Sequence, residues 1–260
     1  MKRLPVALQL YSLREELKAD LDGTLGKVSE MGYDGVELAG LYDRSYTQMR
    51  ELMQRHGLCP ISAHVPLATM REDPDGVFSG YAEIGCRFVA LPWLHGEYHP
   101  GREKFEEFRE TIVRLAGVAR KNGITLLFHN HGDEFQLLNG ERKLDTLYRL
   151  IPADCLQTEI DTCWADFVGV DAAAYVRQYS GRAPLVHLKN HLPQEDAGRD
   201  YPLFCPVGEG APDLRAVVQA AIDAGTQWLV VEQDSVQPGT TPLWCAARSW
   251  ENLQKLQNEG

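Results

Sequence analysis

The feature that most constrains the fold is an alternation of short apolar runs with amphipathic helical segments, repeated eight times along 260 residues. The apolar runs cover residues 6–10, 35–38, 60–64, 88–91, 124–128, 156–160, 185–188 and 228–232. The helical segments that follow them cover residues 15–31, 46–56, 77–84, 104–121, 144–150, 171–179, 214–224 and 242–257. Strict strand–helix alternation predicts a parallel sheet. Eight such units in this length predict an α/β protein, a (β/α)8 TIM barrel, with residues 1–260 forming a single domain.

An open, doubly wound sheet is the second fold that is compatible with this alternation. A dinucleotide-binding sheet of that kind needs Gly-x-Gly-x-x-Gly after its first strand, whereas this chain continues there with Tyr11-Ser-Leu-Arg14. No linker, low-complexity segment or internal repeat divides the chain. The barrel is therefore the first prediction.

Three ionisable residues follow directly on the fifth apolar run. His129, His131 and Glu134 come within six residues of the end of the run 124–128. Burial of ionisable groups at the end of an apolar strand costs several kcal/mol unless they are paired or bound to a metal. This segment therefore indicates a site, and the alternative is a solvated loop that happens to be rich in histidine.

Other predicted strands also end on polar or aromatic residues, and in (β/α)8 barrels the active site lies at the carboxyl ends of the strands. In chain order the candidates are Gln9, Glu37, His64, Trp93, His129, His131, Glu134, Asp161, His187, Lys189 and Glu232. Taken singly, each fits a structural role as well, for example Glu37 beside an arginine or His64 as a core histidine. Oxygen-rich ligands combined with imidazole suit Mn²⁺, Mg²⁺, Co²⁺ or Zn²⁺. Together these residues predict a divalent metal site.

Charge and cysteine usage exclude several classes of function. The formal net charge of −11 argues against nucleic acid as a partner, because phosphate binding needs a basic surface. The six cysteines form no Cys-x-x-Cys pair, which indicates buried thiols in a reducing compartment. No apolar run approaches the 18 residues or so of a membrane-spanning helix. We expect a cytoplasmic protein that acts on a small molecule, without nucleic acid or membrane partners; a homo-oligomer is compatible with the sequence.

Several motifs along the chain resemble those of the sugar phosphate isomerase/epimerase superfamily, the xylose isomerase-like TIM barrels. They begin with Gln-Leu-Tyr-Ser-Leu-Arg at residues 9–14 and include Phe-His-Asn-His-Gly-Asp-Glu-Phe at 128–135, Glu-Ile-Asp-Thr-Cys-Trp-Ala at 159–165, Val-His-Leu-Lys-Asn at 186–190, Val-Gly-Glu-Gly at 207–210 and Val-Glu-Gln-Asp at 231–234. The resemblance covers nearly the whole chain. As a set, the motifs are specific to the superfamily but not to one substrate.

The resemblance implies a divalent metal, Mn²⁺ first among the candidates, held by Glu, Asp, His and Glu from strands five to eight. Asp161, His187 and Glu232 match the last three of these ligands. Many relatives carry Glu where His129 stands, so either Glu134 or a histidine takes the first place, and Glu134 is our assignment. Asn190 is a second departure, because close relatives often have Asp after the lysine.

The remaining roles follow from the chemistry that the resemblance implies. The implied substrate is a sugar or keto-sugar, phosphorylated or not, whose carbonyl is polarised by the metal. A base then removes a proton from the carbon next to that carbonyl. We expect His131 and His129 as base and orienting groups and Lys189 beside the enediolate charge. Gln9, Glu37 and His64 are expected to bind substrate hydroxyls, and Trp93 to form an apolar wall.

Return of the proton makes the protein an isomerase or epimerase, whereas loss of a neighbouring oxygen makes it a lyase or dehydratase of a keto-sugar, inosose or 3-keto-glycoside. A nuclease of abasic DNA and a non-catalytic sugar-binding barrel are the alternatives from other classes. The nuclease would need a basic groove and more metal ligands, and the binding barrel would need neither metal nor base.

Overall fold

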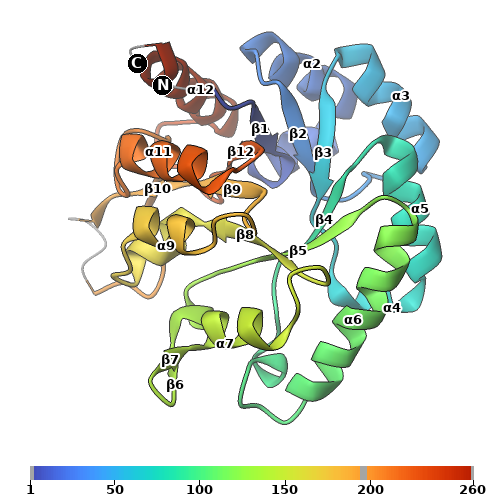
Figure 1. The fold of residues 1–260 in the computed structure, drawn as a ribbon. Coiled ribbons are helices and arrows are strands. Elements are labelled where there is room, and N and C mark those ends of the chain that lie inside the picture. The colour runs from blue at the N-terminus through green and yellow to red at the C-terminus, as the bar shows by residue number, and fades with distance from the viewer. Residues whose placement is uncertain (1–2, 194–197, 259–260) are drawn as a thin grey trace.

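The described residues of this computed structural model, 3–193 and 198–258, form a barrel of eight parallel strands surrounded by helices (Figure 1). The barrel strands are β1 (Val6–Gln9), β2 (Gly35–Leu38), β3 (Cys59–Ala63), β4 (Phe88–Leu91), β5 (Thr125–His129), β8 (Gln157–Asp161), β9 (Leu185–Leu188) and β12 (Trp228–Val231). Their order in the sheet is β3-β2-β1-β12-β9-β8-β5-β4. The two ends of this order meet, because the amide of Val65 donates to the carbonyl of Ala90 (2.9 Å) and the amide of Arg87 to that of Ile61 (3.1 Å). The predicted (β/α)8 barrel is confirmed.

Helices follow the strands around the outside of the barrel, as the colour sequence of Figure 1 shows. They are α1 (Arg14–Ala19), α2 (Leu21–Met31), α3 (Tyr46–His56), α4 (Leu67–Glu72), α5 (Pro74–Ile84), α6 (Phe105–Lys121), α7 (Lys143–Leu150), α8 (Thr162–Phe167), α9 (Ala172–Gln178), α11 (Leu214–Ala224) and α12 (Pro242–Asn258), with 3-10 turns η1 (Leu10–Leu13), η2 (Gly96–Tyr98) and η3 (Asp133–Phe135). The described residues also form two short antiparallel ribbons. In one, β6 (Leu137–Leu138) pairs with β7 (Glu141–Arg142), and in the other β10 (Asn190–His191) pairs with β11 (Phe204–Cys205).

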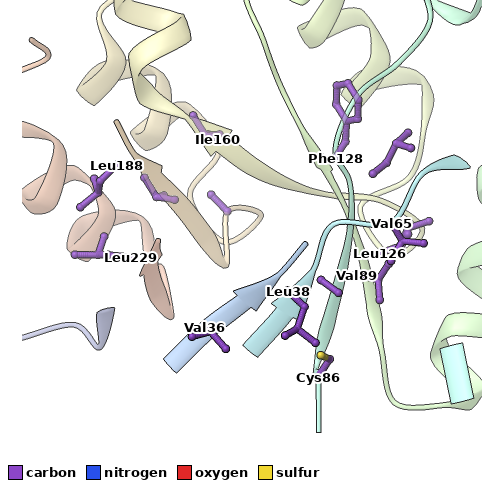
Figure 2. Packing of buried hydrophobic residues seen from close by; sticks show 14 of the residues in the cluster. Val36, Leu38, Val65, Cys86, Val89, Leu126, Phe128, Ile160, Leu188 and Leu229 are labelled. Atoms are coloured by element: carbon purple, nitrogen blue, oxygen red, sulfur yellow. The ribbon is translucent and has the colours of Figure 1, made fainter. Parts of the chain in front are cut away.

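Strand side chains alternate between the helix layer and the barrel interior because successive residues of a strand point to opposite faces. Val36 and Leu38 of β2, with Leu126 and Phe128 of β5, belong to the large buried cluster between strands and helices (Figure 2). A separate small cluster, made of Ala7, Ile61, Phe88, Ala90, Leu127, Leu185 and Val230, fills the barrel interior. The interior is therefore packed, and the residues that follow on the same strand face lie above an apolar floor.

Short elements account for most differences from the predicted segments. The predicted helix 15–31 is divided at Asp20, which leaves helical geometry and whose side chain accepts a hydrogen bond from the amide of Gly23 (3.0 Å). Helices α4 and α8 were not predicted, and each has six residues, too few to display a periodic pattern. Among residues 3–193 and 198–258, the chain contains no helix that is both long and apolar enough to span a membrane.

Candidate active site

Polar residues form the layer of the barrel interior directly above the apolar floor. Ala7, Leu127, Leu185 and Val230 belong to that floor. Two residues further along the same strands come Gln9, His129, His187 and Glu232, which are all buried. Because the side-chain period of a strand is two, each of these residues points into the barrel at its carboxyl end. The same alternation places Glu159 and Asp161 of β8 on the interior face, where both are fully buried.

Four of these side chains form a group that could hold a metal ion. One ligand atom each of His129, Asp161, His187 and Glu232 lies within 4.8 Å of the others. The group is two imidazoles and two carboxylates, a donor set that suits first-row divalent cations. Oδ1 of Asp161 already accepts hydrogen bonds from the amides of Cys163 (2.9 Å) and Trp164 (3.2 Å) at the start of α8. Asp161 is thereby fixed with Oδ2 directed toward the group, so the residues present fit a metal.

Glu159 is a central member of the site that the sequence reasoning missed. Its Oε2 lies 2.7 Å from Nε2 of His64, 3.3 Å from Nδ1 of His129 and 3.5 Å from Nε2 of His187. His64, His129, Glu159 and His187 form a second close group of potential ligands, which shares both of its deeper histidines with the first. The signal was present in the sequence, because Glu159 stands two residues before Asp161 in a predicted strand and must share its face.

Lys189 lies among the carboxylates at the top of the site. Its Nζ is 2.8 Å from Oε2 of Glu232, 3.1 Å from Oδ2 of Asp161 and 3.1 Å from Oδ2 of Asp234. The side chain is almost completely buried, and the ammonium lies over the ring of Phe204. The carboxylates surrounding this ammonium hold the pKa of Lys189 well above its ordinary value despite burial, which alone would lower it. Lys189 therefore carries a fixed positive charge.

The site has more buried carboxylates than buried lysines. Glu37, Glu159, Asp161 and Glu232 are fully or almost fully buried, and Lys189 is the ammonium that faces two of them. Burial and the neighbouring Glu37 raise the pKa of Glu159 to about 7. Crowded carboxylates in a low-dielectric interior favour either protons or a bound cation, and this excess of negative charge is a driving force for metal binding.

The histidines of the site differ in charge. Burial lowers the pKa of His129 well below its ordinary value, and the nearby His187 and His64 lower it further. Burial also lowers the pKa of His131, and Lys189 adds to the effect. By contrast, Glu159 and Glu37 raise the pKa of His187 well above its ordinary value, against the opposing effect of burial. His129 and His131 are therefore neutral near pH 7, the state that a metal ligand or a general base needs, whereas a cation that binds at His187 must displace its proton.

A cavity of about 410 Å³ opens over this layer. Its lining comprises Tyr11, Arg14, His64, Pro92, Trp93, His129, His131, Lys189, Tyr201, Glu232, Asp234 and Ser235. His64, Trp93, His131 and Lys189, predicted as substrate or catalytic residues, thus meet at one pocket. Tyr11, Tyr201 and Asp234 were not predicted; Tyr11 lies in the motif at residues 9–14 and Asp234 ends the motif at residues 231–234, so both had a signal, whereas the exposed Tyr201 had none.

Gln9 and Glu37 lie beneath the pocket rather than on its wall. Nε2 of Gln9 donates to Oε2 of Glu37 (2.8 Å), and the same oxygen lies 2.7 Å from Nε2 of His187. Both residues are completely buried. Their positions do not support the predicted binding of substrate hydroxyls. Instead, Gln9 positions Glu37, and Glu37 orients the imidazole of His187.

Glu134 is placed outside both groups of potential ligands. Its Oε2 accepts a hydrogen bond from the amide of His131 (2.8 Å), and its Oε1 lies 3.3 Å from Nε2 of His99. The assignment of Glu134 as a metal ligand is therefore not supported. The physical reason is that η3 turns the chain back after β5, so the carboxylate closes this turn. His129 lies in the group instead.

The side chain of Asn190 stabilises a loop and does not line the pocket. Its Nδ2 donates to the carbonyl of Pro212 (2.7 Å), and its Oδ1 accepts from the amide of Gly208 (2.6 Å). A carboxylate at this position would lack the donor for Pro212. Asn190 at this position, in place of Asp, therefore lies outside the pocket lining. It links the segment around Gly208 to β10.

Replacing Lys189 by Met is expected to destabilise the metal-free protein by about 3–5 kcal/mol, since removal of one partner leaves buried carboxylates uncompensated. Urea unfolding in the presence of EDTA measures this loss. Lys104→Met is the control, because Lys104 pairs with Glu97 (3.1 Å) at the exposed surface, where such pairs contribute little. Equal stability of the two variants would contradict the charge balance described for the site.

Comparison with known proteins identifies this barrel and its relatives. Residues 25–250 match the family described as the xylose isomerase-like TIM barrel. The inosose dehydratase of Geobacillus kaustophilus (strain HTA426) is 21% identical to this chain over an aligned length of 269 residues, gaps included. The match covers 90% of this chain and 87% of that protein.

Solved structures show the same fold at low identity. A sugar phosphate isomerase/epimerase from Parabacteroides distasonis ATCC 8503 superposes with a TM-score of 0.82 at 20% identity, covering 98% of this chain and 94% of the other. The IOLI protein, solved with a bound zinc atom, superposes with a TM-score of 0.70 at 17% identity, covering 98% and 97% of the two chains.

Proposed function

This chain belongs to the xylose isomerase-like TIM barrel family, and we propose that it is a divalent-metal-dependent isomerase or epimerase of a sugar or keto-sugar. The observation that carries the proposal is the buried group of His129, Asp161, His187 and Glu232 at the base of a pocket that also exposes His131 and Lys189. The proposed partner is a small-molecule sugar. The cytoplasmic location expected from the sequence remains a prediction.

We assign the metal to His129, Asp161, His187 and Glu232, with His129 in place of Glu134. When bound there, the cation supplies a Lewis acid for a carbonyl oxygen. Two carboxylates and two imidazoles suit several divalent cations. Mn²⁺ is our first candidate because the family resemblance implies it, with Zn²⁺, Co²⁺ and Mg²⁺ as alternatives. The zinc of the IOLI protein, a fold relative, is compatible with a cation in such a barrel.

We assign the proton transfer to His131. It lines the pocket, and burial keeps its imidazole neutral by lowering its pKa. The hydrogen bond between its amide and Glu134 fixes the backbone that carries the ring. His131 takes a proton from the carbon next to the substrate carbonyl, and the C–H electron pair moves into an enediolate. The ammonium of Lys189 stabilises the negative charge that develops on oxygen.

The fate of that enediolate distinguishes two candidate reactions. Return of the proton to the opposite face or to the neighbouring carbon gives an epimer or an isomer. The second candidate is a dehydratase, in which a hydroxyl on the next carbon leaves as water with the proton, and its support is the similarity to inosose dehydratase.

Proton exchange in D₂O tests the proposal. The purified protein is incubated with Mn²⁺ and a panel of ketoses, inososes and 3-keto-glycosides, and NMR locates the deuterium. We expect deuterium at a carbon next to the carbonyl of at least one substrate, and no exchange after EDTA treatment. Release of water with formation of an enone, or of the diketone to which its enol tautomerises, would identify the dehydratase. Absence of exchange and of elimination across the panel would contradict the proposed function.

A further inference from the structure

A second cavity adjoins the active-site pocket at the carboxyl end of the barrel. It also has a volume of about 410 Å³ and lies between α4 and the loop that follows β4. Its lining comprises Pro66, Leu67, Ala68, Arg71, Pro92, Trp93, Leu94, His95, Glu97 and Tyr98. Pro92 and Trp93 line both cavities. We call this second cavity the α4 groove.

Trp93 stands at the junction of the two cavities. Its side chain is half exposed, and the ring of His95 packs against it with a centroid distance of 4.2 Å. An exposed indole between two cavities offers an aromatic face on which a ring of a ligand can stack. A ligand that binds in the active-site pocket and extends past Trp93 therefore enters the α4 groove.

The chemistry of the α4 groove differs from that of the active-site pocket. Most of its lining residues are apolar or aromatic. Its two ionised residues, Arg71 and Glu97, each have a partner of opposite charge: Arg71 lies 2.7 Å from Glu107, and Glu97 lies 3.1 Å from Lys104. The described lining thus offers no uncompensated cation to a phosphate, and it favours an uncharged, apolar group.

We propose that the α4 groove binds an apolar, ring-shaped substituent of the substrate, so that the substrate is a sugar derivative carrying such a group, and not a phosphate, on the side that faces this groove, as in an aryl glycoside. The proposal rests on the proposed function for the location of the reacting sugar. The occupant follows from three observations: the cavities share Pro92 and Trp93, the groove has a mostly apolar lining, and Arg71 and Glu97 are paired.

Calorimetric binding tests the α4 groove without any turnover. The probes are p-nitrophenyl β-D-glucopyranoside, methyl β-D-glucopyranoside and glucose 6-phosphate. We expect the nitrophenyl glucoside to bind at least about 10-fold more tightly than the methyl glucoside, a difference of about 1.4 kcal/mol. In the Ala68→Trp variant, where an indole fills the groove, this ratio is expected to fall to about one. Ala68 is exposed at the start of α4, so the larger side chain does not enter the core.

Ala174→Trp is the matched control, because Ala174 is an exposed helical residue of α9 outside the groove. This variant should keep the wild-type ratio. Equal affinity of the wild-type protein for the two glucosides, an unchanged ratio in Ala68→Trp, or binding of glucose 6-phosphate that Ala68→Trp weakens would each overturn the proposal. Because these measurements need no reaction, a failed exchange experiment combined with a preserved ratio would refute only the proposed function.

Discussion

Substitution of Glu232 by Gln is expected to raise the dissociation constant for Mn²⁺ by more than about 100-fold, because even residues outside the ligand shell change metal affinity by 10- to 100-fold. Oε2 of Glu232 lies 3.0 Å from Nδ1 of His187 and 2.8 Å from Nζ of Lys189, at the edge of the candidate ligand group. Gln keeps the shape but removes the charge. Isothermal titration of the EDTA-treated protein with Mn²⁺ measures the loss, and circular dichroism verifies the fold.

Glu134→Gln is the matched control for this experiment. Glu134 is as deeply buried as Glu232 and lies close to the pocket, but it belongs to neither group of potential ligands. We expect it to keep Mn²⁺ affinity within a few-fold of wild type. If Glu134→Gln lost the metal and Glu232→Gln retained it, the sequence-based assignment of Glu134 would be correct and our reassignment to His129 would be wrong.

The second large effect is expected for His131→Asn, which should retain Mn²⁺ and lose proton exchange by about 10²- to 10⁴-fold, the usual scale for a general base. Asn retains a polar side chain but cannot accept the substrate proton. The experiment combines calorimetry with the rate of deuterium incorporation for a substrate found in the exchange panel.

A histidine remote from the pocket provides the control for this second prediction. His56 lies 2.6 Å from Asp22 at the end of α3, so His56→Asn should alter neither metal binding nor exchange. Loss of Mn²⁺ binding in His131→Asn would show that His131 is a metal ligand and not the general base. Wild-type exchange in that variant would transfer the proton step to another group of the pocket.

Much of this architecture was predictable because it depends on local periodicity. The eight apolar runs and the helices behind them reflect side-chain patterns that sequence displays directly. Since barrel topology then brings strand ends together, Asp161, His187 and Glu232 were predicted to converge, and they lie in one group with His129. The alternation of side chains along a strand also predicts Glu159, which precedes Asp161 by two residues in β8 and so points to the same face.

The remaining differences between the predicted roles and the positions of these side chains come from geometry that periodicity does not determine. Gln9 ends β1 and Glu37 precedes the last residue of β2, as expected, but their depth in the barrel depends on the length and register of the two strands. Glu134 lies in a 3-10 turn, where three residues change the direction of the chain and so the direction of the side chain. Asn190 was noted in the sequence only as a departure from the family pattern; its amide bonds to Pro212, a contact across 22 residues that no local pattern predicts.

The location of the bound cation tests the central claim most directly. Crystals of the protein grown with Mn²⁺ are measured on both sides of the manganese absorption edge, and the anomalous difference map locates the metal. We predict one strong peak among His129, Asp161, His187 and Glu232, the group whose ligand atoms lie within 4.8 Å of one another. A peak at Glu134, or no peak in a protein that nevertheless catalyses exchange, would contradict this assignment.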